Sequence, residues 1–139
     1  MSVTVSQIVG RSLRLIQVID ARQPVKASDV ETAILALNAM VRRWEADGIS
    51  LGWVPVNNPS DELVVPEEAE QAVAANLAVL LAPEYGVAIS PVVASMATQG
   101  MNDIMRDQQV ATPIRPILNA PIPSEYRSNT INGSSWYNG

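Results

Sequence analysis

The 139-residue sequence contains no cysteine and no histidine. Without cysteine the chain has no disulfide bond, no thiol nucleophile and no thiolate ligand for zinc. Without histidine it has no imidazole general base and no Ser-His-Asp triad. A metal site could use only carboxylates, amides and carbonyls, and the sequence has no calcium-binding loop motif of the DxDxDG type. We therefore predict a protein without a metal or a cofactor.

Basic residues are scarce and unevenly placed. Lys26 is the only lysine, and neither lysine nor arginine occurs from Trp44 to Met105. Nine acidic residues fall in that stretch, whereas residues 1–43 carry six bases and three acids. The net charge of −5 disfavours a protein that binds DNA by neutralising its phosphates. The pattern instead favours a protein that assembles with other subunits.

Long apolar runs are also missing. The longest uncharged apolar run, residues 71–83, is too short to cross a bilayer and suits a buried helix. The N-terminal sequence MSVTVSQIVGRS lacks the basic start and apolar core of a signal peptide. We expect a protein made in the cytoplasm with no membrane partner.

What is present predicts an all-α fold, a small bundle of about four helices. We expect a helical domain over residues 1–110, with a short β-ribbon or loop inserted at about 49–65, and an extended Pro-rich C-terminal arm over residues 111–139. Apolar spacing places the helices at about 4–19, 28–46, 66–82 and 90–109. The first would be capped by Thr4, the second would begin with a capping box from Ser28 to Glu31, and Gly48 would end it. The third is apolar nearly all round, which is typical of a central helix or of a subunit interface.

Strand-forming residues on either side of an Asn- and Pro-rich turn predict a two-stranded ribbon between the second and third helices. Such a ribbon is marginal alone, so we interpret it as a docking device for a neighbour or a tail component. Trp53 could be either core cover or a binding anchor, whereas Trp44 is expected in the core. The candidate docking residues are Trp53, Val54, Pro55, Val56, Asn57 and Asn58.

The Pro-rich arm cannot form a helix but carries apolar and aromatic anchors, which indicates that it binds a partner. Its candidate residues are Ile114, Arg115, Pro116, Ile117, Leu118, Ile122, Tyr126, Ile131, Trp136 and Tyr137. A second candidate set is electrostatic and would act between subunits or along a channel. It comprises Arg11, Arg14, Arg42, Arg43, Glu67, Glu68 and Glu70. The acidic block is either a solvated face or a negative wall that lets DNA pass without binding.

Two carboxylates flanking a cleft would suit a peptidoglycan hydrolase, and Glu67, Glu68, Glu84 and Asp103 are its candidates. These acids fall at helix starts and loop tips, where solvation and the helix dipole explain them. No P-loop, GxGxxG or SxxK motif appears. We therefore predict that the chain is not an enzyme, and keep a tail-associated hydrolase with a Glu/Asp pair and a DNA-packaging accessory protein as alternatives.

Three short motifs occur in order along the chain. Trp44–Ile49 reads WEADGI, followed by Gly52 and Trp53; Asn76-Leu77-Ala78 and Ala82-Pro83-Glu84-Tyr85 follow downstream. They resemble the W-x-x-D-G-I, N-L-A and A-P-[DE]-Y of the head-to-tail adaptors of short-tailed phages. These are the tail accessory factors, or packaged-DNA stabilisation proteins, of the Salmonella podophage type. The resemblance covers roughly residues 5–110.

This resemblance implies a structural head-to-tail connector of the virion, made in the host cytoplasm and located at the head–tail junction. It implies a homo-oligomeric ring, a dodecamer, beneath the portal protein. The arm would grip the portal, and the opposite face would receive the next tail component, a nozzle or hub protein. The ring would seal the packaged DNA and form its exit channel, through which DNA passes without sequence-specific binding.

Overall fold

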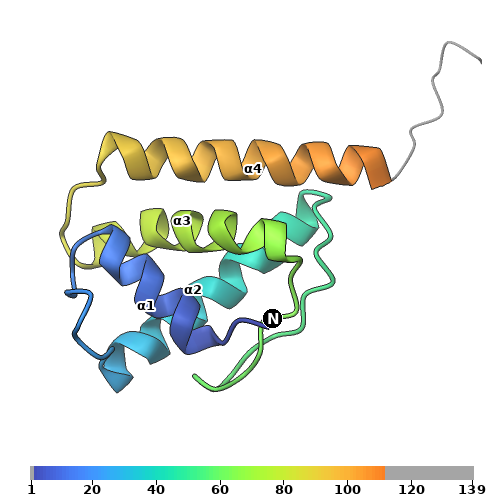
Figure 1. Ribbon diagram of the computed structural model, residues 1–139. Coiled ribbons are helices and arrows are strands. Elements are labelled where there is room, and N and C mark those ends of the chain that lie inside the picture. The colour runs from blue at the N-terminus through green and yellow to red at the C-terminus, as the bar shows by residue number, and fades with distance from the viewer. Residues whose placement is uncertain (1, 112–139) are drawn as a thin grey trace, which may run out of the picture.

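The computed structural model describes residues 2–111, and within them the chain forms four helices and no strand (Figure 1). The helices are α1 (Val5–Leu15), α2 (Ala27–Ala46), α3 (Glu67–Glu84) and α4 (Pro91–Ala111). The predicted all-α bundle of about four helices is confirmed. Ala111 ends α4, and the remainder of the predicted C-terminal arm lies outside the described residues.

The arrangement places α3 at the centre of the bundle. It packs against all three other helices, most extensively against α4, which runs back along it as the second half of a helical hairpin (Figure 1). α1 and α2 cover the other side of α3. This position explains why α3 is apolar nearly all round, since such a helix needs partners on every face. Its buried residues are Ala69, Ala72, Val73, Ala74, Ala75, Leu77, Ala78, Leu81 and Ala82.

The α3–α4 hairpin depends on small residues where its two helices meet. A Cβ atom built on Gly100 would lie 2.6 Å from Ala72 Cβ and 2.8 Å from Ala72 Cα, so only glycine fits. Asn76 lies nearby on α3, and its Nδ2 donates to the carbonyl oxygen of Ala97, 3.1 Å away on α4. Glycine at position 100 therefore permits the close approach of α4 to α3 within the chain itself.

A buried hydroxyl joins α1 to α3. Ser12 is fully buried, and its Oγ lies 2.9 Å from the carbonyl oxygens of Ile8 in its own helix and Ala74 in α3. The single hydroxyl hydrogen is donated to these two acceptors, so the buried polar group is satisfied. The contact fixes the position of α1 along the axis of the central helix α3.

The helix ends agree with prediction at some positions and correct it at others. Thr4 caps α1 as predicted, and Gln7 completes a capping box with it. α1 ends at Leu15, four residues earlier than expected, because Gln17 adopts a left-handed φ of 61°. The capping box from Ser28 to Glu31 is wrong: α2 begins at Ala27 after Lys26, so Ser28 already lies in the first turn. Gly48, at φ 94°, follows the end of α2 as predicted.

The predicted β-ribbon between the second and third helices is wrong. Residues 49–65 contain no strand, and their one bridge pairs Glu62 with Thr4 at the start of the chain. The segment does not pair with itself because its backbone groups bond to the N-terminal residues and to side chains of α2 and α4. The loop form of the predicted insertion is what the structure contains.

Candidate interaction surfaces

We call residues 47–66, which join α2 to α3, the inter-helix segment. Its side chains divide into an inner and an outer set. Trp53, Val56 and Leu63 are buried in the core, whereas Val54 and Val64 are about half exposed. Trp53 is thus a core residue in this chain, although no described group accepts a hydrogen bond from its buried Nε1.

An asparagine on α2 binds the middle of the inter-helix segment. Asn38 Nδ2 donates to the carbonyl oxygen of Val56 at 2.8 Å, and Val56 N–H donates to Asn38 Oδ1 at 3.1 Å. The side-chain amide therefore satisfies both backbone groups of Val56, which a neighbouring strand would otherwise have bonded. This pair of bonds replaces the ladder that the ribbon prediction assumed.

A glutamine on α4 does the same at the start of the segment. Gln108 Oε1 accepts from the backbone N–H of Ser50 at 3.2 Å, and Gln108 Nε2 donates to the carbonyl oxygen of Ser50. Sequence reasoning missed both amide side chains. The available signal was an amide inside each helical pattern, which is weak because such residues are usually solvent-exposed.

The tip of the inter-helix segment is a turn organised by one carboxylate. Asp61 Oδ2 accepts from the backbone N–H groups of Asn57 and Asn58, each at 2.9 Å. These hydrogen bonds favour the charged carboxylate and hold the pKa of Asp61 below its ordinary value. Asn57 and Asn58 are exposed at this tip, but their backbone is fixed rather than free to rearrange.

The N-terminal residues complete the anchoring. Val5 N–H donates to the carbonyl oxygen of Asp61, and Leu63 N–H donates to that of Val3, both at 2.9 Å. Ser6 N–H donates to the carbonyl oxygen of Pro59, also at 2.9 Å. Of the six predicted docking residues, Trp53 and Val56 thus face the core, and the other four remain exposed: Val54, Pro55, Asn57 and Asn58.

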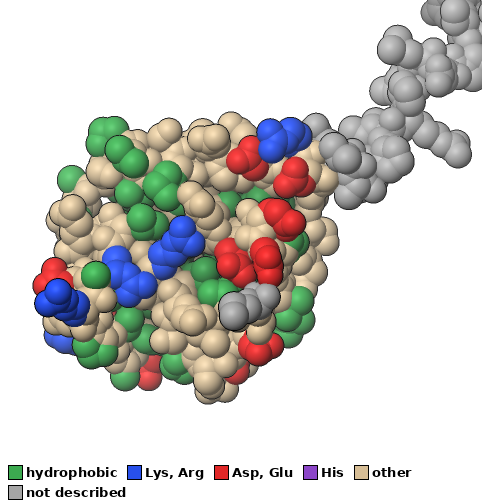
Figure 2. All heavy atoms as spheres, in the orientation of Figure 1, with side chains coloured by type: hydrophobic (Ala, Val, Ile, Leu, Met, Phe, Trp, Pro, Cys, Tyr) green, Lys and Arg blue, Asp and Glu red, His purple; other side chains and the backbone are tan. Residues whose placement is uncertain are grey.

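The predicted electrostatic residues separate into two places. Arg11 and Arg14 on α1 line the same hollow as Glu70 of α3, a space of about 380 Å³. On the face drawn in Figure 2, most Lys and Arg side chains lie on one part and most Asp and Glu side chains on another, with a few of each sign beside the other. Within one subunit, Arg11, Arg14 and Glu70 therefore border the same hollow, and their action between subunits or along a channel stays a prediction.

Arg42 and Arg43 are exposed at the other end of the chain's basic region, near the end of α2. Arg43 Nε lies 3.4 Å from Asp47 Oδ2, an exposed pair worth little stability. Glu67 and Glu68 are exposed in the first turn of α3, where they complement the positive end of the helix dipole. The structure thus brings Arg11, Arg14 and Glu70 together but places Arg42 and Arg43 on a separate surface.

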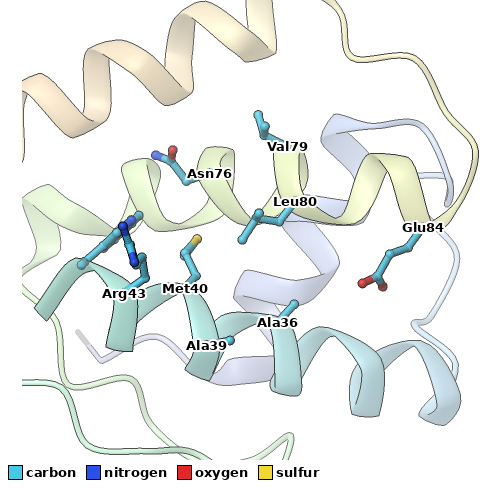
Figure 3. A pocket seen from close by; sticks show the side chains of 9 residues that line it. Ala36, Ala39, Met40, Arg43, Asn76, Val79, Leu80 and Glu84 are labelled. Atoms are coloured by element: carbon cyan, nitrogen blue, oxygen red, sulfur yellow. The ribbon is translucent and has the colours of Figure 1, made fainter. Parts of the chain in front are cut away.

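A groove between α2 and α3 was not predicted. It has a volume of about 470 Å³, and the side chains around it come from both helices (Figure 3). We call it the α2–α3 groove; it is lined by Ala36, Ala39, Met40, Arg43, Trp44, Asn76, Val79, Leu80 and Glu84. Most of these are apolar, and Leu80 is 46% exposed. The missed signal is the pair of alanines one turn apart on α2, which leaves space where larger side chains would fill it.

The A-P-[DE]-Y motif has a structural role at the end of α3. Tyr85 donates its hydroxyl hydrogen to Asp29 Oδ1 at 2.8 Å, which joins the end of α3 to the first turn of α2. Burial and this bond to a carboxylate raise the pKa of Tyr85 to about 12. The tyrosine of the motif therefore joins the end of α3 to the start of α2.

The four candidate hydrolase carboxylates are spread along the bundle. Glu68 and Asp103 line one hollow of about 190 Å³ between α3 and α4, whereas Glu84 lies at the opposite end of α3. Among residues 2–111 no three acidic side chains group so as to hold a metal ion. Within the same range no helix combines the length and the hydropathy that a bilayer span requires.

Comparison with known proteins identifies a family. The model of a family described as P22 tail accessory factor matches residues 1–139, the whole chain. A search of curated proteins returned no match.

Proposed function

The chain belongs to the P22 tail accessory factor family, so it is a structural, tail-associated component of a phage virion that associates with other virion proteins; we propose that it is the head-to-tail connector. In this role it forms a ring beneath the portal, seals the packaged DNA, lines the exit channel and provides the attachment site for the next tail protein. The observation that carries the proposal is the family match over the whole chain.

The chemistry of the chain supports assembly rather than catalysis. A ring built from identical subunits needs two different surfaces on each copy, because its contacts are head to tail. The chain offers distinct candidates: the α2–α3 groove, the exposed side of the inter-helix segment, and the α1 surface with Arg11 and Arg14. Glu67, Glu68 and Glu70 would give a channel a negative lining, over which DNA phosphates slide without binding.

The C-terminal arm is proposed as the portal-binding element. Its Ile, Leu, Trp and Tyr residues are spaced along a Pro-rich sequence that lies outside the described residues. Apolar and aromatic side chains spaced along such a sequence are suited to anchor it on a partner protein.

The proposal is tested by mixing the purified chain with the portal ring of the same phage and measuring the mass of the product. We expect a defined number of copies on each portal, and loss of binding when residues 111–139 are removed. A truncated chain with unchanged helical circular dichroism is the folding control. Absence of any complex between the full chain and the portal would overturn the proposal.

The alternative of a tail-associated hydrolase makes a different prediction. Peptidoglycan zymography would show clearing that disappears in Glu68→Gln or Asp103→Asn, the two carboxylates that share a hollow. We expect no clearing from the chain or from either variant.

A further inference from the structure

Four of the six large apolar side chains that are exposed among residues 2–111 lie on α2, α3 and the inter-helix segment, and the other two, Val92 and Met105, lie on α4. Leu80 lines the α2–α3 groove and is 46% exposed, and Leu35, 73% exposed, lies on the outer side of α2, one turn before the groove residue Ala39. On the inter-helix segment, Val54 and Val64 are 56% and 51% exposed. Large apolar residues left in water on two separate surfaces are typical of protein interfaces.

The middle of the inter-helix segment and the groove lie on roughly opposite sides of α2, although the first residue of the segment, Asp47, pairs with Arg43 of the same copy. Asn38, which holds the inter-helix segment at Val56, follows Ala36 by two residues, a rotation of about 200° around the helix axis. The segment of one copy therefore cannot fill the groove of the same copy. A second copy can bring its segment to that groove, and its own groove then remains open for a third.

Charge complementarity favours the same pairing. Arg42 and Arg43 are the only adjacent basic residues in the sequence, and Arg43 lines one end of the α2–α3 groove. The inter-helix segment contains no base, and Glu62 is exposed on it. Opposite charges at the edge of an apolar contact orient two partners and exclude the reversed arrangement.

The backbone of the inter-helix segment is also preorganised for binding. Asn38, Gln108 and Asp61 fix its backbone through side-chain hydrogen bonds within the single copy. A segment that is already ordered loses little conformational entropy on association.

We propose that the α2–α3 groove of one copy binds the inter-helix segment of the next copy, so that Val54 and Val64 cover Leu35 and Leu80, and Glu62 faces Arg42 and Arg43. The inference rests on the proposed function, because it requires a ring of identical subunits. It assigns the head-to-tail subunit contact to two named surfaces.

The absence of cysteine makes cross-linking a direct test. Phage particles would be assembled with full-length chains carrying one cysteine on each surface: Val54→Cys or Val64→Cys together with Leu35→Cys or Leu80→Cys. A short flexible bis-maleimide then removes the strict geometry that a disulfide needs. At least one of the four pairs should give a ladder of covalent oligomers on denaturing gels. Each variant with a single cysteine should run as a monomer on the same denaturing gels.

A matched control pairs Leu80→Cys with Thr98→Cys, an exposed position on α4 outside both surfaces, and should give no ladder. Dimers from Leu80→Cys alone would mean that groove meets groove, and a link from that cysteine to a different virion protein would mean another occupant. Either result overturns the inference. So does the lack of a ladder in all four pairs when native mass shows that the chain is still multimeric.

Measuring the native mass distinguishes two outcomes. If the proposed function is wrong, no multimer forms; if only the proposed subunit contact is wrong, a multimer forms but is not cross-linked. A charge exchange gives a second readout. Arg42→Glu with Arg43→Glu should reduce the ring population at least about tenfold, and adding Glu62→Arg should restore a substantial part of it. Equal loss with and without Glu62→Arg would contradict the proposed pairing.

Discussion

The α3–α4 hairpin and the inter-helix segment are held in place by different physical means. The hairpin is stabilised by buried apolar side chains and by the close approach at Gly100. The inter-helix segment depends on a few hydrogen bonds, in which Asn38, Gln108 and Asp61 bind backbone groups. The hairpin is therefore sensitive to a change in side-chain volume, whereas the segment is sensitive to the loss of a single polar group.

The largest effect is expected in the hairpin. Leu77 is fully buried on the central helix, so Leu77→Ala should lower the free energy of unfolding by about 2–5 kcal/mol through lost apolar contact and a cavity. Urea denaturation followed by circular dichroism measures it. Leu80→Ala, at a 46% exposed position on the same helix, is the matched control and should change stability far less. Equal losses would mean that α3 is not central.

The next effect is expected in the inter-helix segment. Asn38→Ala leaves the N–H and carbonyl groups of Val56 without their partner, which should cost about 1–3 kcal/mol. Hydrogen exchange at the Val56 amide should accelerate, while exchange in α3 and α4 changes only by the global loss. Asn38→Asp keeps the acceptor but not the donor, so an intermediate effect is expected. Uniform acceleration in every element would contradict a separate anchoring of the segment.

A smaller effect should follow from adding volume to the hairpin. Gly100→Ala forces a Cβ into Ala72, and overpacking of this kind costs about 1–3 kcal/mol. Alanine recovers up to about 1 kcal/mol through its higher helix propensity. The net loss of about 1 kcal/mol is measurable by thermal unfolding against Gln99→Ala, an exposed neighbour that gains propensity without a clash. A stabilised Gly100→Ala would show that the helices move apart freely.

The smallest effect concerns the charge on Asp61. Its pKa in the folded chain is held below the ordinary value of 3.8, so the stabilisation is complete above that value. It is lost as the pH falls through the lowered pKa. The amide proton shifts of Asn57 and Asn58 should titrate together with a midpoint below 3.8. Asp61→Asn should abolish this shared titration, and its persistence would place the titrating group elsewhere.

The same contrast explains what could be predicted from the sequence. The hairpin follows from local signals, since Pro91, the apolar run of α3 and Gly86 mark its elements. The inter-helix segment was predicted to pair with itself, because its strand-forming residues give no hint of partners elsewhere. Those partners are Asn38 and Gln108, 18 and 58 residues away from the positions they bind. Such contacts depend on how the helices pack, and the residues near the segment in the sequence do not reveal that packing.

The candidate surfaces show a similar limit. Arg11, Arg14 and Glu70 could be selected from their charge, but their common hollow exists only after α1 packs against α3. The α2–α3 groove has only a weak signal in the sequence, two alanines one turn apart on α2, because the groove is the space that these small side chains leave unfilled once α2 packs against α3. The roles of the arm and of the ring contacts remain predictions that the experiments above address.

The backbone bonds between the start of the chain and the inter-helix segment have a mechanical consequence. Val3, Val5 and Ser6 bond to Leu63, Asp61 and Pro59, so tension applied at the N-terminal residues is carried first by these three hydrogen bonds. Val5 is itself a buried core residue, so breaking these bonds also begins to withdraw its side chain from the core. The first turn of α1 and the tip of the inter-helix segment would therefore yield together, at low force, while α3 and α4 stay packed.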